Sequence, residues 1–158
     1  MPRRYSSAAL LLLLSLGCEA KPAPAPAPPP ERGPEYAIPL GEELFARFLE
    51  KAHRMEPEGE IRRGALEEGR RDTLQLILTG VYCYKILALG GEGVEELDLI
   101  LYDGENVPLL RDREEDRRPT LGIDEPICPF EPGTFRLDIQ MARGSGNYVL
   151  RVYKVLTI

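Results

Sequence analysis

The sequence predicts a mainly β fold, an antiparallel β-sandwich or jelly roll preceded by one short amphipathic helix. Three observations predict it. Five segments of seven to nine residues alternate apolar and polar side chains or run largely apolar, as strands do. Residues typical of turns separate these segments, and no helical pattern follows residue 58. Short strands at such spacing, without helices between them, pack as two layers.

Residues 1–17 have the three parts of a secretory signal. Arg3 and Arg4 form a positive n-region, a nine-residue apolar stretch follows, and Gly17 is a small residue before Cys18. A stretch of nine residues is too short to cross a bilayer, which takes about 20, but it suits a signal peptide. We therefore expect an exported protein.

The letters "LSLGC", residues 14–18, resemble the lipobox of bacterial lipoproteins, in which the cysteine is lipidated and the signal is cut before it. Gly17 fits the small residue required there, while Ser15 stands where the family usually carries Leu. The resemblance implies that Cys18 carries acyl chains, and more than one chain makes membrane anchoring stable. The alternative is an ordinary signal peptide cut nearby. Glu19, in place of the inner-membrane Asp of enteric lipoproteins, implies the outer membrane, on its periplasmic or surface face.

Residues 18–38 are predicted to be a lipid-anchored linker. Seven of the 15 prolines lie between Pro22 and Pro34, mostly alternating with alanine. Such a tract buries nothing and favours extended polyproline II, so its 17 residues from 19 to 35 would reach roughly 50 Å at about 3.1 Å each. The alternative is a ligand for a proline-reading domain.

Residues 39–57 are predicted to hold one amphipathic helix, at about 41–55. Acidic residues come early in it and basic residues late, as the helix dipole favours. Its apolar residues recur at helical spacing: Leu44, Phe45, Phe48, Leu49 and Ala52. We expect this stripe to pack on the following domain; a helix that docks on a partner is the alternative. His53, the sole histidine, has no local partners for metal binding or catalysis and is expected to be structural.

Residues 58–158 are predicted to form the sandwich. The clearest strand is "TFRLDIQM", residues 134–141, in which every second side chain is apolar. Further strands are predicted at 73–79, 82–89, 96–102 and 147–155. Turn residues occupy 90–93, 103–106, 132–133 and 143–147.

The order of these strands resembles the bacterial pre-peptidase C-terminal type of β-sandwich. That family has an early G-x-L, a strand ending near a tyrosine, an L-x-L-x-L-Y-D strand and a final hairpin with G-x-Y/F-x-L in each strand. The matching positions, within about 60–158, are Gly64, Leu66, Tyr84, Leu97, Leu99, Leu101, Asp103, Gly133, Phe135, Leu137, Gly146, Tyr148 and Leu150. The other two cysteines and the helix are not part of the pattern. Such domains accompany secreted enzymes, so the resemblance implies a non-catalytic module for folding, attachment or binding.

Cys83 and Cys128 are the thiols that remain once Cys18 is assigned to the anchor. In an exported protein an even remainder predicts a disulfide. Thiol catalysis would want a cysteine of low pKa beside a histidine, and the only histidine belongs to the helical segment. We therefore expect a structural disulfide between Cys83 and Cys128.

The letters "RDREEDRRP", residues 111–119, mix both charges in one long connection. We expect a solvated loop. Long loops at the end of a sandwich commonly hold binding function, so this loop is also our candidate contact surface for a partner. Its candidate contact residues are Arg111, Arg113, Arg117 and Arg118.

Several polar residues of the sandwich could include calcium ligands: Asp98, Asp103, Glu105, Asn106, Asp112 and Asp124. The loop 103–106 lacks the spacing of a dedicated calcium loop, so we expect solvated turn acids and no metal. Gly144-Ser145-Gly146 is expected to be a hairpin turn rather than a nucleophile elbow. No phosphate loop, dinucleotide fingerprint or zinc pair is present, so we predict neither catalytic residues nor a cofactor.

The net charge completes the prediction. Without residues 1–17 the chain has 18 basic and 26 acidic residues, a net charge of −8, which argues against nucleic-acid binding.

We expect a lipid-anchored cell-envelope protein whose non-catalytic sandwich binds a protein or glycan partner. One alternative is a structural subunit of an envelope machine that docks through the helix at 41–55. Another is a small secreted hydrolase whose site no motif reveals.

Overall fold

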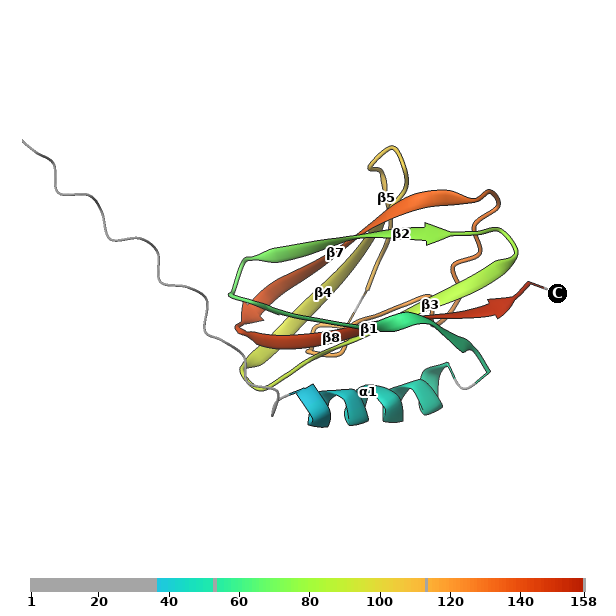
Figure 1. The fold of residues 1–158 in the computed structure, drawn as a ribbon. Helices are drawn as coiled ribbons and strands as arrows, with labels where there is room; N and C mark the ends of the chain where they lie inside the picture. The colour runs from blue at the N-terminus through green and yellow to red at the C-terminus, as the bar shows by residue number, and fades with distance from the viewer. Residues whose placement is uncertain (1–36, 53, 113, 158) are drawn as a thin grey trace, which may run out of the picture. The chain divides into compact units, whose positions relative to one another are not determined.

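The chain folds into two antiparallel β-sheets with one helix on the outside, as Figure 1 shows. The structure is a computed structural model that describes residues 37–52, 54–112 and 114–157. Its elements are α1 (Ala37–Lys51), β1 (Glu56–Leu66), β2 (Arg71–Leu78), β3 (Tyr82–Gly90), β4 (Val94–Tyr102), β5 (Pro108–Arg111), β6 (Thr120–Leu121), β7 (Gly133–Gly144) and β8 (Gly146–Leu156). One sheet has the strand order β1-β8-β3-β6 and the other β2-β7-β4-β5. The predicted mainly β sandwich is confirmed.

The main core lies between the two sheets and follows from the period of two along the central strands. In the central parts of β4 and β7, from Leu97 to Leu101 and from Leu137 to Met141, every second side chain points inward and is fully buried. The fully buried core residues are Ile86, Ala88 and Leu150 from the first sheet and Leu97, Leu99, Leu101, Leu137, Ile139 and Met141 from the second. Burying one large apolar side chain of this kind contributes about 1.5–3 kcal/mol.

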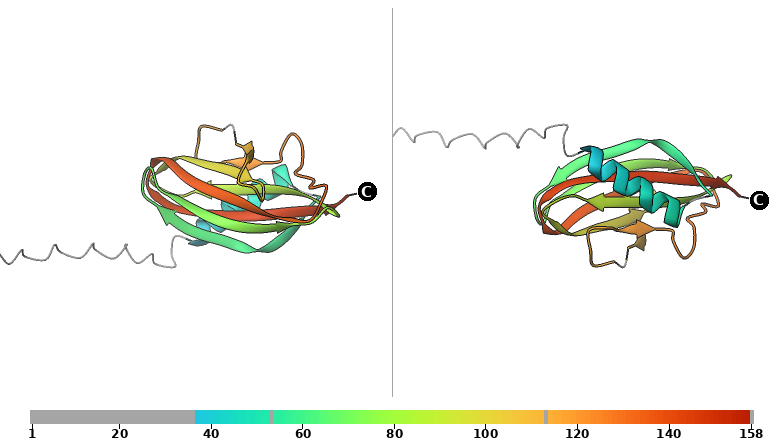
Figure 2. Two further views of the ribbon diagram at one scale, coloured as in Figure 1. Left: turned by 90° about the horizontal axis from the view of Figure 1, so that it is seen from above. Right: turned by 90° about the horizontal axis from the view of Figure 1, so that it is seen from below.

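A second cluster joins α1 to the outer face of the β1-β8-β3-β6 sheet, and Figure 2 shows the helix lying across that face. Its buried residues are Leu40, Leu44, Ala52, Met55, Leu87, Leu89, Val149 and Tyr153. The Phe48 ring stacks on the Tyr153 ring, with centroids 4.6 Å apart. The described part of the apolar stripe therefore packs on the domain, as the sequence predicts.

The helix lies further towards the N-terminus than its pattern predicts. It spans Ala37–Lys51 instead of about 41–55, and the last residues of the predicted helical segment begin β1. Pro39 falls in the first turn, where proline is tolerated because the first N–H groups of a helix have no partner within it. At the other end, the Lys85 ammonium donates to the Lys51 carbonyl at 3.0 Å, which satisfies one of the last free carbonyls.

Three strands show no clear alternation: β1, β5 and β6. The first of them contains a proline and several charged residues, and it pairs with β8 at the edge of the sheet. The pairing shifts register between Glu58 and Arg62. Proline, charge and a bulge on an edge strand discourage pairing with other chains. The other two strands have only four and two residues, so no period can show.

A disulfide joins Cys83, at the start of β3, to Cys128 in the connection between β6 and β7. The two Cα atoms lie 4.2 Å apart, and the predicted pairing is confirmed. The predicted signal peptide, Cys18 and the predicted linker up to residue 36 lie outside the described residues, as do His53 and Arg113. Within the described part of the chain, no helix has the length and apolarity needed to cross a bilayer.

Candidate binding site

The connection between β5 and β6, residues 112–119, runs along the side of the sandwich from one sheet to the other. The backbone N–H of Asp112, its first residue, donates to the Leu99 carbonyl of β4 at 3.1 Å. Its carbonyls accept hydrogen bonds from the backbone N–H groups of Leu97 on β4 and of Ala88 and Gly90 on β3, at 2.7–3.1 Å. The connection therefore covers the edges of both strands, whereas the sequence predicts a solvated loop. Buried backbone groups need such partners, and only the fold reveals which strands supply them.

The predicted contact arginines do not form one cluster. Arg117 fastens the connection to its surroundings, because its guanidinium donates to the Gly90 carbonyl at 2.7 Å and to the Glu43 carboxylate of α1 at 3.0 Å. Arg111 ends β5 and forms an ion pair at 2.5 Å with Asp98, a buried residue of the neighbouring strand β4 in the same sheet. Both arginines are thus occupied by structural contacts.

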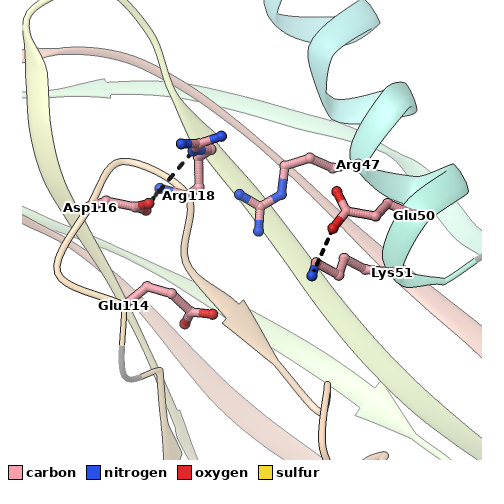
Figure 3. A pocket seen from close by; sticks show the side chains of 6 residues that line it. All are labelled: Arg47, Glu50, Lys51, Glu114, Asp116 and Arg118. Atoms are coloured by element: carbon pink, nitrogen blue, oxygen red, sulfur yellow. Dashed lines mark hydrogen bonds and ion pairs between the residues drawn. The ribbon is translucent and has the colours of Figure 1, made fainter.

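Arg118 is the remaining described arginine of that set, and it lines a solvent-open hollow between α1 and the connection. Figure 3 shows three side chains reaching the hollow from each of the two segments. The hollow has a volume of about 220 Å³. Its lining consists of three basic and three acidic residues: Arg47, Glu50 and Lys51 from α1, and Glu114, Asp116 and Arg118 from the connection.

Most of the charges in the hollow already have a partner. Lys51 pairs with Glu50 at 2.8 Å on the helix side. Arg118 pairs with Asp116 at 3.6 Å on the other side. The carboxylate of Glu114 accepts a hydrogen bond from the hydroxyl of buried Thr120 at 3.0 Å, which fixes its position on the wall.

Arg47 differs from these residues. Its Nε atom is buried and has no hydrogen-bond partner among the described residues, and Figure 3 shows its guanidinium pointing into the space between helix and connection. Burial lowers the pKa of Arg47, and the nearby positive charge of Arg118 lowers it further, although the surrounding carboxylates act in the opposite direction. The hollow therefore contains a guanidinium that forms no ion pair with the described residues.

A buried carboxylate lies at the start of the same connection. Asp112 is buried, and one of its oxygens accepts a hydrogen bond from the Leu99 N–H, while the other has no partner among the described residues. Burial raises the pKa of Asp112 to about 7; the Leu99 N–H opposes this shift, and the charges of Asp98 and Glu114 add to it. Protonation of this carboxyl therefore falls in the neutral range.

The structure corrects the expectation of solvated turn acids at two positions. Asp98 and Asp112 are buried, with 4% and 8% of their surface exposed. Arg111 pairs with the first, and hydrogen bonds to the Leu99 backbone hold the second against β4. Asp103 does act in a turn, since its carboxylate accepts the N–H groups of Glu105 and Val107 at 2.9 and 2.8 Å. Among the described residues, no three His, Cys, Asp or Glu side chains lie close enough together to hold a metal ion.

Ser145 lies in the hairpin turn between β7 and β8, as the sequence predicts. Its hydroxyl accepts a hydrogen bond from the backbone N–H of Glu68 at 3.1 Å, so it supports the neighbouring turn. The hollow itself is lined by guanidinium, ammonium and carboxylate groups without a serine, threonine or cysteine. Such a lining offers a ligand charges and hydrogen-bonding groups of both kinds.

The sequence does not single out Arg47. It is one of several charged residues on the polar side of an amphipathic helix, and only the packing of α1 on the sheet brings it opposite residues 112–119. No local pattern could have indicated this contact.

Comparison with known proteins found neither a protein-family model nor a curated protein that matches this chain.

Proposed function

We propose that the protein is a lipid-anchored component of the cell envelope, whose non-catalytic sandwich binds a partner at the hollow between α1 and residues 112–119. The observation that supports this most is the guanidinium of Arg47, which reaches the hollow without a hydrogen-bond partner for its Nε among the described residues. The same guanidinium has no ion pair among the described residues, and a ligand that accepts hydrogen bonds from its outer nitrogens would supply one.

The anchoring part of the proposal rests on the sequence. Residues 1–17 have the parts of a signal peptide, and Cys18 follows a lipobox-like "LSLG". The Pro/Ala tract after it would hold the domain away from the lipid surface. Within this proposal, Glu19 alone points to the outer membrane. Export itself agrees with a disulfide between Cys83 and Cys128, since such bonds persist outside the cytosol.

A structural subunit that docks through the helix is the second candidate function. Two residues of the apolar stripe, Leu44 and Phe48, contact the protein's own sheet, so they are not available to a partner in this arrangement. The polar side of α1, by contrast, opens on the hollow. This contrast favours binding at the hollow over docking through the stripe.

A photocrosslinking experiment in intact cells tests the proposal. A photoreactive residue at Ala46, exposed on α1 one turn before Glu50, should crosslink to one defined envelope component. The matched control is the same residue at Gln75, which is exposed on β2 of the other sheet. Replacing both Arg47 and Arg118 by Gln should abolish the product at Ala46. Identical products at both positions, or a product at Ala46 that survives the double substitution, would refute binding at the hollow.

A further inference from the structure

We propose that the hollow recognises a single acidic side chain of a protein partner, an Asp or Glu whose carboxylate binds the guanidinium of Arg47 while Glu114 accepts the N–H of the adjoining backbone. The inference rests on the proposed function and adds the chemistry of the ligand. It concerns only residues of the hollow defined by Arg47, Glu50, Lys51, Glu114, Asp116 and Arg118.

The charges around Arg47 favour a negatively charged ligand. Lys51 and Arg118 each have an acidic partner within 4 Å, at 2.8 and 3.6 Å, whereas no ion pair of Arg47 is found among the described residues. Because Arg47 and Arg118 face the same space, their positive charges repel each other, and an anion between them would relieve this repulsion. A carboxylate matches the planar fork of a guanidinium with two parallel hydrogen bonds.

The acidic residues limit how much negative charge can enter. Three carboxylates share the lining with three cations, so the hollow has no net charge before a ligand binds. A dianionic phosphate would face stronger repulsion from Glu50, Glu114 and Asp116 than a carboxylate with a single negative charge. The arrangement therefore favours a monoanion.

The opposite wall adds a second requirement. Glu114 is held by the Thr120 hydroxyl at 3.0 Å, and Figure 3 shows its carboxylate directed towards the same space as the Arg47 guanidinium. A carboxylate only accepts hydrogen bonds, so it needs a donor on the ligand, and a peptide N–H next to an acidic side chain provides one. The lining has no aromatic ring on which a sugar could stack. A peptide therefore fits better than an acidic sugar.

An NMR titration of the mature, lipidated chain in detergent micelles tests this chemistry. The probes are N-acetyl-glutamate amide, which has one side-chain carboxylate between two peptide groups, and N-acetyl-glutamine amide, its neutral counterpart. The glutamate probe should shift the Nε–H resonance of Arg47 at low salt, and the glutamine probe should not. In Arg47→Gln the binding of the glutamate probe, followed by the remaining amide resonances, should weaken about 10- to 100-fold, the effect of removing a hydrogen bond between charged groups.

The matched control is Arg111→Gln, which removes an exposed arginine paired with Asp98 outside the hollow and should leave probe binding unchanged. Unchanged amide resonances away from the hollow show that each variant is folded. Equal shifts with both probes, no shift at all, or undiminished binding to Arg47→Gln would each overturn the inference. So would tighter binding of inorganic phosphate, or of glucuronate as a model acidic sugar. These results leave the crosslinking test of partner binding independent, since a partner captured at Ala46 could still bind through other chemistry.

Discussion

Gly64 lies directly opposite Tyr148 in the β1–β8 pair, and a methyl group added to Gly64 would overlap the tyrosine ring. The ring thus occupies the space that a side chain at residue 64 would fill. Its hydroxyl donates to the Asp72 carboxylate of β2 at 2.7 Å. Because β8 and β2 belong to different sheets, the absence of a side chain at Gly64 allows Tyr148 to link the two layers.

We expect Gly64→Ala to lower the free energy of unfolding by about 1–3 kcal/mol, the usual cost of forcing an extra group into a packed site. Urea unfolding measures this difference. The matched control is Gly41→Ala in α1, where an added methyl group meets no atom within 4 Å. This second change should raise stability by about 0.5–1 kcal/mol, because alanine favours a helix more than glycine does. Equal stability of Gly64→Ala and the wild type would show that the ring has room to move.

The Cys83–Cys128 bond closes a loop with a sequence separation of 45 residues. In the chain-entropy model such a crosslink stabilises the folded state by about 4 kcal/mol, because it restricts the unfolded chain. Replacing both cysteines by alanine should therefore lower the urea midpoint markedly, and reduction of the wild type should lower it to a similar degree. Two thiols that titrate in the oxidised, exported protein would rule out the bond.

Asp112 should make stability depend on pH. Its pKa is about 7 in the folded protein against an ordinary value of 3.8, so between these values the folded state binds a proton that the unfolded state has lost. Its contribution to the free energy of unfolding is therefore fully present below about pH 4 and declines as the pH rises to about 7. Asp112→Asn, whose amide oxygen can still accept the Leu99 N–H, should remove this decline. Parallel stability profiles of variant and wild type would contradict it.

Much of the fold could be predicted because each face of a central strand keeps the same surroundings, core or exterior, along the strand. On β7, Leu137, Ile139 and Met141 are buried while their neighbours face outward, so the period of two is visible in the sequence. The strand β3 is buried on both faces, since α1 covers the outer one, and it reads as a nearly continuous apolar run. The edge strand β1 lacks such a pattern because its stability comes from pairing with β8.

The candidate site could be predicted only in part. The mixed charges of residues 111–119 predict a contact surface in this connection, and Arg118 does line the hollow. Arg117 has the same chemistry but is held by Glu43 and the Gly90 carbonyl, a difference that depends on the position of α1. Arg47 lies more than 60 residues earlier, and long-range packing of this kind leaves no local signal in the sequence.

Membrane partitioning tests the central proposal, that a lipid on Cys18 rather than the domain itself holds the protein at the membrane. The processed chain has a net charge of −8, so anionic surfaces should repel it. Cys18→Ser should block lipidation, and with it the cut before residue 18 that depends on lipidation. That variant should then keep its signal or be released by another peptidase.

The most direct measurement compares the wild type with a chain that begins at Glu19 behind an unrelated secretory signal, since the two share the whole folded domain and differ in the anchor. After washing of the membranes and detergent phase separation, we expect the wild type in the detergent phase and the Glu19 chain in the soluble fraction. A Glu19 chain that still sediments with the washed membranes would contradict the proposal, because the domain would then bind there by itself.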